Sequence, residues 1–455
     1  MTQTKVRLRR DAELAESGGA LRVSAPVGAI GLRDLPPGTV AALGALAAGD
    51  MTDAGLTAAV VDGDGEAGLL RWNMLVRRLA RSGLLEYSVD GARLRPVGSG
   101  PLEPAAAPAP DARVKLSRFA VATAEDGVLT VRSPRHAGVV ELAPRAAGIL
   151  GALADWTTPA ELAEALPGVP VEQVLRFFDA AGLLTRTSED EDQSHAQWTP
   201  RDLWLHAHSR GPRLTGRYGG TYPLGPRFGP LPAAPAPFDG PRIPLAPPDL
   251  ELAAKSDPSL TETLERRRSL REHDADSPIT VDRLGELLYR SMRRRNSFTS
   301  PDGAELVDRP YPSGGSIHEL EVYPLIVSCE GAEPGLWHYD TAGHALERVA
   351  EPGPATEILV RRARASALLE ADPQVLLVVT ARFGRVMWKY ETIAYSLMLK
   401  HVGVLYQTLY LVGTAMDLAV CGLGGGDAGD FAAASGLDYL TEGSVGELVI
   451  GSKRG

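Results

Sequence analysis

The chain contains little cysteine, no long hydrophobic run and no excess of basic residues. Its 455 residues include only Cys329 and Cys421, which excludes a disulfide framework and a thiolate cluster for zinc or iron–sulfur. No uninterrupted apolar stretch reaches the roughly 20 residues that span a bilayer, and no apolar segment follows residues 1–10 as in a secretory signal. The formal net charge of -10 disfavours a nucleic-acid-coating function. We therefore expect a cytoplasmic protein that binds neither membrane nor nucleic acid.

Several common catalytic motifs are missing as well. No Walker motif, strand-linked G-x-G-x-x-G, H-E-x-x-H or G-x-S-x-G occurs, which removes most nucleotide hydrolases, nicotinamide Rossmann enzymes, zincins and serine hydrolases. What is present is ordinary globular composition, with 44% hydrophobic and 23% charged residues. At about 150 residues per domain, the length predicts roughly three domains.

The first half of the chain contains an internal repeat. Residues 41–47 read A-A-L-G-A-L-A and residues 148–154 read G-I-L-G-A-L-A. Strand-like text precedes each copy, and each ends in Gly-Leu-Leu, where Gly83 and Gly182 suit the left-handed position after a helix. Strands, three short helices and a final strand predict a winged-helix-like domain used twice, over residues 1–100 and 108–190.

The third helix of each copy tests whether these domains bind DNA. Residues 70–82 carry four arginines, whereas residues 171–181 are close to neutral. One basic helix without a matching partner is weak support for operator binding. Docking or scaffold domains are therefore the favoured interpretation.

A proline-rich stretch separates the repeat from the last domain. Prolines are densest between Pro223 and Pro248, which excludes a helix or a central strand there. We interpret residues 191–260 as a linker that packs on the catalytic domain. Beyond it, α/β alternation predicts helices at 280–294, 354–367 and 391–416, and strands at 321–328, 375–381 and 446–450. The run V-L-L-V-V-T at 375–380 is apolar on both faces and predicts a central buried strand.

Four separated signals in the last domain suggest a ligand site. Arginines at 266–271 surround Ser269 and suit a terminal phosphate, although such a run is more often a solvated helix face. The loop P-S-G-G at 312–315 lets a flat ligand approach the backbone, or forms a simple turn. The apolar helix through 403–416 ends in a glycine turn and should be buried in a core or between subunits. The last strand delivers two cations, Lys453 and Arg454.

Together these motifs resemble the FMN-dependent nitroreductase fold. The P-S-G-G loop, and Trp388-Lys389-Tyr390 ahead of the long helix, are similar to those of the SagB/ThcOx-type azoline dehydrogenases. The resemblance covers about residues 198–454. It implies an α+β fold in which residues 261–455 form a dimeric nitroreductase-like domain, a mixed sheet flanked by helices, after two tandem winged-helix-like domains that resemble peptide-leader recognition elements. Glu319 departs from the family pattern, because a proline is expected after His318.

The resemblance also implies FMN at the interface of a homodimer, and no metal. The positions that match cofactor contacts are Arg267, Arg268, Ser269, Arg271, Pro312, Ser313, Gly314, Gly315, Gln407, Gly424, Gly425, Lys453 and Arg454. Lys389 and Tyr390 match the family's essential pair. We expect Tyr390 to act as general base, with Lys389 either lowering its pKa or protonating a developing enolate oxygen. The alternative is that the pair simply begins a helix with the lysine solvated.

The implied reaction is the two-electron oxidation of thiazoline or oxazoline rings to thiazoles or oxazoles in a ribosomally synthesised peptide. The implied partner is the azoline-containing precursor, and a complex with the cyclodehydratase of the same pathway is left open. Two alternatives remain at this point. One is a general NAD(P)H-dependent flavin nitroreductase, and the other is a non-catalytic peptide-binding scaffold, which would be colourless when purified.

Overall fold

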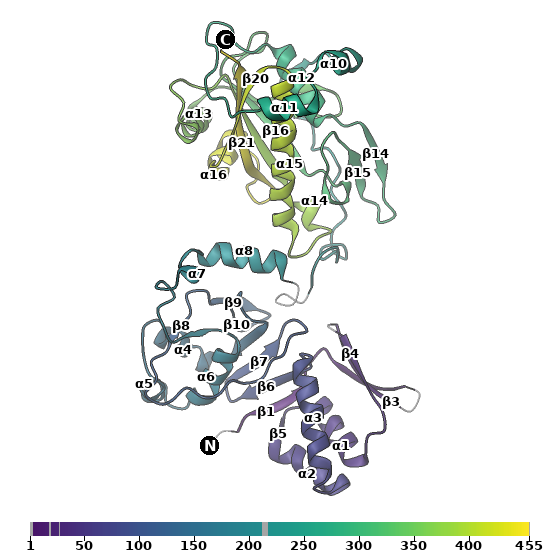
Figure 1. The fold of residues 1–455 in the computed structure, drawn as a ribbon, viewed down its shortest axis with the longest axis vertical. Helices are drawn as coiled ribbons and strands as arrows, with labels where there is room; N and C mark the ends of the chain where they lie inside the picture. Colours follow the sequence, from purple (N-terminus) through teal and green to yellow (C-terminus); the bar gives the residue numbers. More distant parts are fainter. Residues whose placement is uncertain (1–2, 18–19, 27, 212–216, 455) are drawn as a thin grey trace. The chain divides into compact units, whose positions relative to one another are not determined.

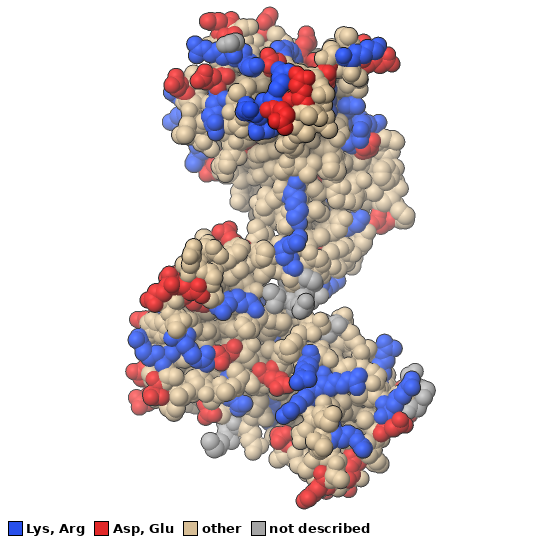
Figure 2. Space-filling model, in the orientation of Figure 1, with Lys and Arg blue, Asp and Glu red and all other residues tan. Residues whose placement is uncertain are grey.

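The chain forms two compact units, Met1–Tyr218 and Gly219–Gly455 (Figure 1). The computed structural model describes residues 3–17, 20–26, 28–211 and 217–454. In these ranges no helix is long and apolar enough to cross a membrane. On the face drawn in Figure 2, acidic and basic side chains are intermixed over the surface. We call the two parts the N-terminal unit and the C-terminal unit.

The N-terminal unit runs through one order of elements twice. The first copy has three antiparallel strands and then three helices: β2 Glu13–Ser17, β3 Ala20–Ala25, β4 Gly28–Leu32, α1 Pro37–Ala48, α2 Asp53–Asp64 and α3 Gly68–Arg81. The second copy follows the same order: β9 Val121–Glu125, β10 Val128–Arg132, β11 Gly138–Leu142, α4 Gly148–Ala152, α5 Pro159–Ala165 and α6 Val171–Ala180. Each copy has its own hydrophobic core.

Glycine ends the third helix of both copies, as the repeat predicts. Gly83 has φ 64° and Gly182 has φ 65°, in the left-handed region that disfavours other residues. A Cβ at Gly182 would lie 2.0 Å from the imidazole Cδ2 of His136, so this position has no room for a side chain. The leucines that follow each glycine are buried and lead the chain back into its core.

One seven-stranded antiparallel sheet joins the two copies. Its order is β5-β1-β6-β7-β11-β10-β9, where β1 is Lys5–Leu8, β5 is Met51–Thr52, β6 is Leu85–Val89 and β7 is Ala92–Pro96. The junction is the pairing of β7 from the first copy with β11 from the second, with Leu94 opposite Val140. The short strands β8 Lys115–Leu116 and β12 Leu184–Thr185 pair separately.

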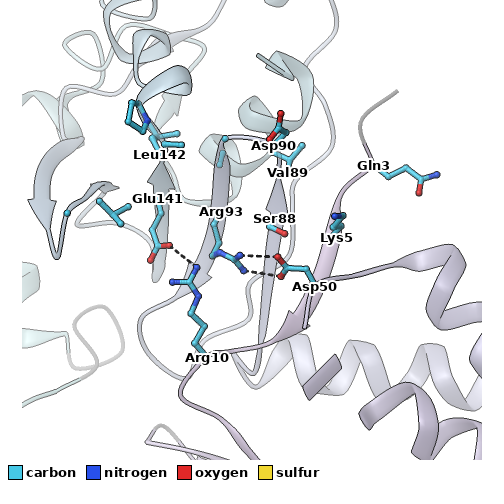
Figure 3. A pocket seen from close by; sticks show the side chains of 16 residues that line it. Gln3, Lys5, Arg10, Asp50, Ser88, Val89, Asp90, Arg93, Glu141 and Leu142 are labelled. Carbon is cyan, nitrogen blue, oxygen red and sulfur yellow. Dashed lines mark hydrogen bonds and ion pairs between the residues drawn. The ribbon is translucent and has the colours of Figure 1, made fainter. Parts of the chain in front are cut away.

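A charged groove of about 630 Å³ lies on this joined sheet (Figure 3). In it the Arg93 guanidinium donates to both carboxylate oxygens of Asp50 at 3.1 and 3.2 Å, and Arg10 lies 3.7 Å from Glu141. Both arginines also approach the buried Glu86, whose pKa is raised by burial. Because the opposite charges neutralise one another, the groove does not present one sign of charge. It contains none of the predicted site residues.

The C-terminal unit is built on a second seven-stranded sheet, ordered β13-β18-β17-β16-β19-β21-β20. The strands are β13 Arg242–Pro244, β16 Leu320–Ile326, β17 Gly335–Asp340, β18 Ala345–Ala350, β19 Val375–Arg382, β20 Leu418–Leu423 and β21 Glu442–Ser452. The helices are α10 Leu250–Ser256, α11 Leu260–Arg266, α12 Val281–Met292, α13 Pro354–Ala367, α14 Phe383–Met387, α15 Ala394–Ala415 and α16 Ala428–Ser435. A hairpin of β14 Asn296–Thr299 and β15 Glu305–Asp308 stands apart from the sheet.

Helices cover both faces of this sheet. Leu377 of β19 belongs to the core that contains α12 and α15, whereas the adjacent Leu376 belongs to the core that contains α13 and α16. All eight residues of β19 are buried, which confirms the predicted central strand. This strand lies between β16 and β21, so the residues that follow it are held at the end of a rigid sheet.

Three expectations need refinement. The predicted mixed sheet has antiparallel pairs between all of its strands, and the parallel pairing described in this unit is the isolated bridge between Thr280 and Glu330. The predicted linker is divided between the units, because α7 Gln193–Ala196 and α8 Pro200–Arg210 lie in the N-terminal unit, where Trp204 donates to the Phe119 carbonyl at 3.0 Å. The described residues 191–211 therefore belong to the N-terminal unit, and the proline-rich stretch from Gly219 onward belongs to the C-terminal unit. The apolar helix α15 buries only one face and exposes Tyr395 and Leu399 on the other.

Candidate functional site

The P-S-G-G loop and the Lys389–Tyr390 pair meet in space. The antiparallel pairing of β16 with β19 sets Leu320 opposite Ala381. Because the loop precedes β16 and the pair follows β19, both emerge at the same end of the sheet. Gly315 has φ 66°, and a Cβ there would lie 2.9 Å from the Tyr390 Oη and 3.4 Å from the Lys389 Nζ. Three predicted site residues from distant parts of the sequence therefore share one small region.

The Lys389–Tyr390 pair is held by the end of α14 and by part of the proline-rich stretch. The Tyr390 amide donates to the Val386 carbonyl at 2.9 Å, and the Tyr222 amide donates to the Lys389 carbonyl at 3.0 Å. The preceding Trp388 donates from its indole to the Phe228 carbonyl at 2.7 Å. The Lys389 Nζ lies 5.8 Å from the centre of the Tyr222 ring and 5.7 Å from that of Tyr390. The lysine is thus placed against two aromatic rings rather than on a bare helix surface.

The expected lowering of the Tyr390 pKa is wrong for this structure. Burial raises the pKa of Tyr390 above its ordinary value. Burial is the cause of this shift, and the Lys389 ammonium, 5.7 Å from the centre of the ring, does not reverse it. The second expectation for Lys389, protonation of a developing enolate oxygen, is unaffected.

Gly315 provides a test of this close approach. Gly315→Ala combines left-handed backbone strain of about 1–2 kcal/mol with a Cβ 2.9 Å from the Tyr390 Oη. Because the side chain or the loop must shift, we expect the rate of a reaction that uses Lys389 and Tyr390 to fall about 10–100-fold. The matched control is Gly303→Ala, which has φ 83° but no atom within 4 Å of the added Cβ. Equal rates in the two variants, measured at matched FMN content, would contradict the contact.

Behind the loop lies a buried pair that the sequence did not reveal. The Gly314 amide donates to the His401 Nε2 at 2.8 Å, and the His401 Nδ1 lies 2.7 Å from the Glu319 Oε1. The Ser313 Oγ accepts from the His318 amide at 3.0 Å. The loop is thereby fixed to α15 on one side and to its own continuation on the other.

A second group of predicted residues gathers at the far end of α15. The β20–β21 pairing sets Leu418 opposite Ser452, which brings the adjacent Asp417 and Lys453 together, with Nζ 2.8 Å from Oδ1. Arg266 lies 3.7 Å from the same carboxylate, and Arg268 lines the same small cavity. The hydrogen bond from Lys453 holds the pKa of Asp417 below its ordinary value. More cations than carboxylates surround this point, so it can accept an added anion.

Ser269 and Arg267 border this cationic group through Tyr410. The Ser269 Oγ lies 3.0 Å from the Tyr410 Oη, which accepts from the Gly422 amide at 2.7 Å. The Arg267 guanidinium stands 5.5 Å from the centre of the Tyr410 ring. The remaining predicted cations are more exposed: Arg271 lies on the surface, and Arg454 lies 4.0 Å from Glu272. The predicted contact Gln407 is exposed on α15.

The glycine turn after β20 stands beside a buried acid. Gly424 and Gly425 are exposed, and a Cβ at Gly426 would lie 2.4 Å from the Glu447 Oε1. Pairing of Leu423 with Glu447 produces this contact. Burial raises the pKa of Glu447 to about 7, and the neighbouring carboxylates of Asp427 and Asp430 add to the effect.

The raised pKa of Glu447 leads us to expect a specific pH dependence of the free energy of unfolding. Its pKa is about 7 when folded and near 4.5 when unfolded, so the folded chain binds the extra proton between these values. Stability should therefore fall as pH rises through this window, by about 2–3 kcal/mol between pH 5 and pH 8 at 1.36 kcal/mol per pH unit. Glu447→Gln should remove that part of the decline in the free energy of unfolding, measured by denaturant melts. The exposed Glu357→Gln is the control, and an unchanged pH slope in Glu447→Gln would contradict the assignment.

The sequence analysis assigned no site role to His401, Tyr410, Asp417 and Glu447, and it noted Glu319 only as a departure from the family pattern. One signal was available for His401, which is a lone histidine between the buried apolar residues Met398 and Leu405 of α15. Asp417 and Glu447 depend on strand register, which the sequence pattern does not specify at single-residue precision.

Comparisons with known proteins match two parts of the chain. Residues 264–452 match the nitroreductase family, and residues 114–215 match the cyanobactin oxidase ThcOx family. The resemblance to SagB/ThcOx-type, nitroreductase-like azoline oxidases is confirmed. The C-terminal unit of this ThcOx-like chain contains the nitroreductase match, and the described sheet and helices give it an α+β architecture.

Individual relatives cover different shares of this ThcOx-like chain. The putative nitroreductase MJ1384 of Methanocaldococcus jannaschii is 25% identical over 176 residues, covering 39% of this chain and 83% of the relative. The microcin B17-processing protein McbC of Escherichia coli is 33% identical over 128 residues, covering 27% of this chain but only 46% of McbC. One solved structure is the E. coli microcin synthetase McbBCD complex with truncated pro-MccB17 bound. Its alignment covers 44% of this chain and 74% of the matched chain in that structure, at 26% identity and a TM-score of 0.36. Three other nitroreductase structures, matched at 12–14% identity and TM-scores of 0.26–0.31, were solved with FMN bound.

Proposed function

We propose that this chain catalyses the FMN-dependent oxidation of thiazoline or oxazoline rings to the aromatic azoles in a ribosomally synthesised peptide. The observation that supports this most is the meeting of Lys389 and Tyr390 with the left-handed Gly315 in a ThcOx-like chain. The names of the microcin relatives agree with peptide processing. A solvated lysine at a helix start would not require this contact.

The residues present fit FMN. Arg266, Arg268 and Lys453 supply guanidinium and ammonium donors for a terminal phosphate, and these three cations outnumber the carboxylates of Asp417 and Glu262 beside them. A flat ring can lie close to backbone that carries no side chains. Such backbone is present at Gly314 and Gly315, and at the exposed turn of Gly424 and Gly425. When bound, FMN supplies the acceptor for the hydride that leaves the ring CH2 of the azoline.

The chain's own groups must orient the azoline and handle one proton. That proton leaves the carbon between the ring nitrogen and the peptide carbonyl, where the negative charge is delocalised. Tyr390 accepts it at Oη as general base, and Lys389 stabilises or protonates the enolate oxygen that develops on the carbonyl. Because Tyr390 is partly buried beside Gly315 and its pKa is raised, the phenolate is scarce at neutral pH but strongly basic once formed.

The two groups of site residues suggest a homodimer. His401 contacts the loop and Tyr410 contacts Ser269, and these helix residues are nine positions apart, about 2.5 turns and about 14 Å along α15. His401 and Tyr410 therefore point to opposite sides of α15. The loop and the cationic group of one chain consequently do not face the same ligand. A second copy packed on the exposed side, at Tyr395 and Leu399, would bring its own loop toward these cations.

The proposed partners follow from the same comparisons. The precursor peptide with its azoline rings is the substrate, and the match of residues 114–215 to the ThcOx family supports a role in that pathway for the N-terminal unit. A complex with the cyclodehydratase of the pathway is supported by the microcin synthetase complex among the structural neighbours. Pull-down of this chain with the cyclodehydratase and precursor tests the association.

The decisive experiment incubates the purified yellow protein with peptides that carry one thiazoline or one oxazoline. We expect a mass loss of two hydrogens per ring, and comparison of the two peptides gives the ring preference. No mass change on either peptide, together with NAD(P)H-driven quinone reduction, would instead support a general nitroreductase. A colourless protein that does not take up added FMN would support a non-catalytic scaffold.

A further inference from the structure

The hydrogen-bond directions around His401 define its tautomer. A backbone amide can only donate, so the His401 Nε2 that receives the Gly314 N–H carries no proton. The proton of the neutral ring is then on Nδ1 and is donated to the Glu319 carboxylate at 2.7 Å. Both side chains are buried, with Glu319 fully enclosed and His401 4% exposed. Water is therefore not available to replace either bond.

The buried carboxylate of Glu319 lowers the stability of the folded chain. Its second oxygen, Oε2, is buried and has no hydrogen-bond partner among the residues that the structure describes. A buried carboxylate with an unsatisfied oxygen destabilises the folded state, whereas an apolar side chain at the same place would not. Glu319 is also the position at which the chain departs from the proline expected in the family, and a proline side chain has no acceptor for a histidine N–H.

The loop held by His401 is the one that faces the Lys389–Tyr390 pair. A Cβ at Gly314 would lie 2.9 Å from the Leu397 side chain and 3.3 Å from the His401 Nε2, so the loop lies directly against α15 at this residue. The next residue, Gly315, faces the Tyr390 hydroxyl. A shift of the Gly314 amide would therefore move Gly315 relative to the tyrosine.

We propose that Glu319 and His401 are positioning residues that hold the P-S-G-G loop against Lys389 and Tyr390 by fixing the Nδ1–H tautomer of His401. Glu319 keeps the proton on Nδ1, Nε2 stays an acceptor, and the Gly314 amide stays bonded to it. Without the carboxylate the ring is free to carry its proton on Nε2, where it would oppose the Gly314 N–H. This inference rests on the proposed function only for the reaction that the loop serves.

The first test reads the tautomer directly, without turnover. In the protein labelled with 15N-histidine, we expect the His401 ring to show a protonated Nδ1 and a hydrogen-free Nε2. Glu319→Gln retains an acceptor oxygen and should keep this pattern, whereas Glu319→Leu should move the proton to Nε2. A wild-type His401 protonated on Nε2, or an unchanged pattern in Glu319→Leu, would overturn the proposal.

The second test compares rates with folding. Glu319→Leu should slow azole formation about 100-fold, as expected for misplacement near 1 Å, and Glu319→Gln should stay within about 3-fold of the wild type. The double variant Glu319→Leu/His401→Leu removes both partners together, so it should melt close to the wild type yet stay slow. His344→Gln, at a buried histidine beside Tyr339, controls for general destabilisation. Wild-type rates in the double variant would overturn the positioning role. Absence of azole formation in the wild type would instead count against the proposed function, and the result on the His401 tautomer would still hold.

Discussion

Tyr390→Phe should lower the rate of azole formation by about 10²–10⁴-fold while the purified protein keeps its yellow colour. The range is the usual contribution of a positioned general base. Phenylalanine retains the ring that faces Gly315 and Lys389 but removes the Oη that accepts the proton. Because FMN contacts are assigned to other residues, flavin occupancy should be unchanged. The measurement is single-turnover mass spectrometry of an azoline peptide at matched flavin content.

The control is Tyr439→Phe, an exposed tyrosine of the same unit, which should react at the wild-type rate. Lys389→Ala should also be slow, and its defect should not add fully to that of Tyr390→Phe, because the two groups act on one proton transfer. Normal turnover in both Tyr390→Phe and Lys389→Ala would remove the pair from the mechanism.

The raised pKa of Tyr390 adds a pH dependence to this prediction. A tyrosine is protonated at neutral pH and burial raises the pKa of Tyr390 further, so the reactive phenolate fraction should grow as the pH becomes alkaline. The wild-type rate should therefore rise through the alkaline range, and the residual rate of Tyr390→Phe should not follow the same rise. A wild-type profile that is flat above neutral pH would assign the base to another group.

The sequence predicted three helices and three strands of the C-terminal unit, because their patterns are local. The α/β alternation predicted one helix at 354–367, and α13 runs from Pro354 to Ala367. The continuous apolar run at 375–381 became β19, because only a strand covered on both faces needs such a sequence. The glycine stops of the two repeats followed from the same kind of local rule.

The site itself was only partly accessible from sequence. The P-S-G-G loop and the Lys389–Tyr390 pair could be named separately, but their contact depends on the antiparallel pairing of β16 with β19, a long-range choice. The meeting of Asp417 with Lys453 depends likewise on the register of β20 and β21. Glu319 was noticed only as a departure from a pattern, since its role requires a histidine from a helix far along the chain.

The apolar helix α15 shows why composition alone could not decide between core and interface. Its residues are apolar on nearly every side, yet Met398, Val402 and Leu405 are buried while Tyr395 and Leu399 are about 40% exposed. Gly403 lies on the exposed side, where nothing within 4 Å would meet a Cβ. A helix with one apolar side left in solvent, and a glycine that permits close approach, is suited to pack against a second copy.

Leu399→Asp should therefore convert the proposed flavin-bound homodimer into a monomer that loses FMN. In a two-fold interface each substitution occurs twice, and two desolvated carboxylates should raise the dimer dissociation constant about 1000-fold or more. FMN should be lost in parallel, because the loop and the cationic group of one chain lie on opposite sides of α15. Molecular mass in solution and the flavin absorbance of the same fractions provide the two readouts.

The matched control is Leu368→Asp, at the end of α13, where the leucine is 85% exposed and has φ 55°. Aspartate tolerates that backbone conformation, so this variant adds the same charge without strain and should remain a yellow dimer. If Leu399→Asp also remained a yellow dimer, the subunit contact would lie elsewhere on the chain. A wild-type monomer fully loaded with FMN would contradict the dimer, because both groups of site residues would then have to reach the cofactor within one chain. In the structure these two groups are separated by about 2.5 turns of α15.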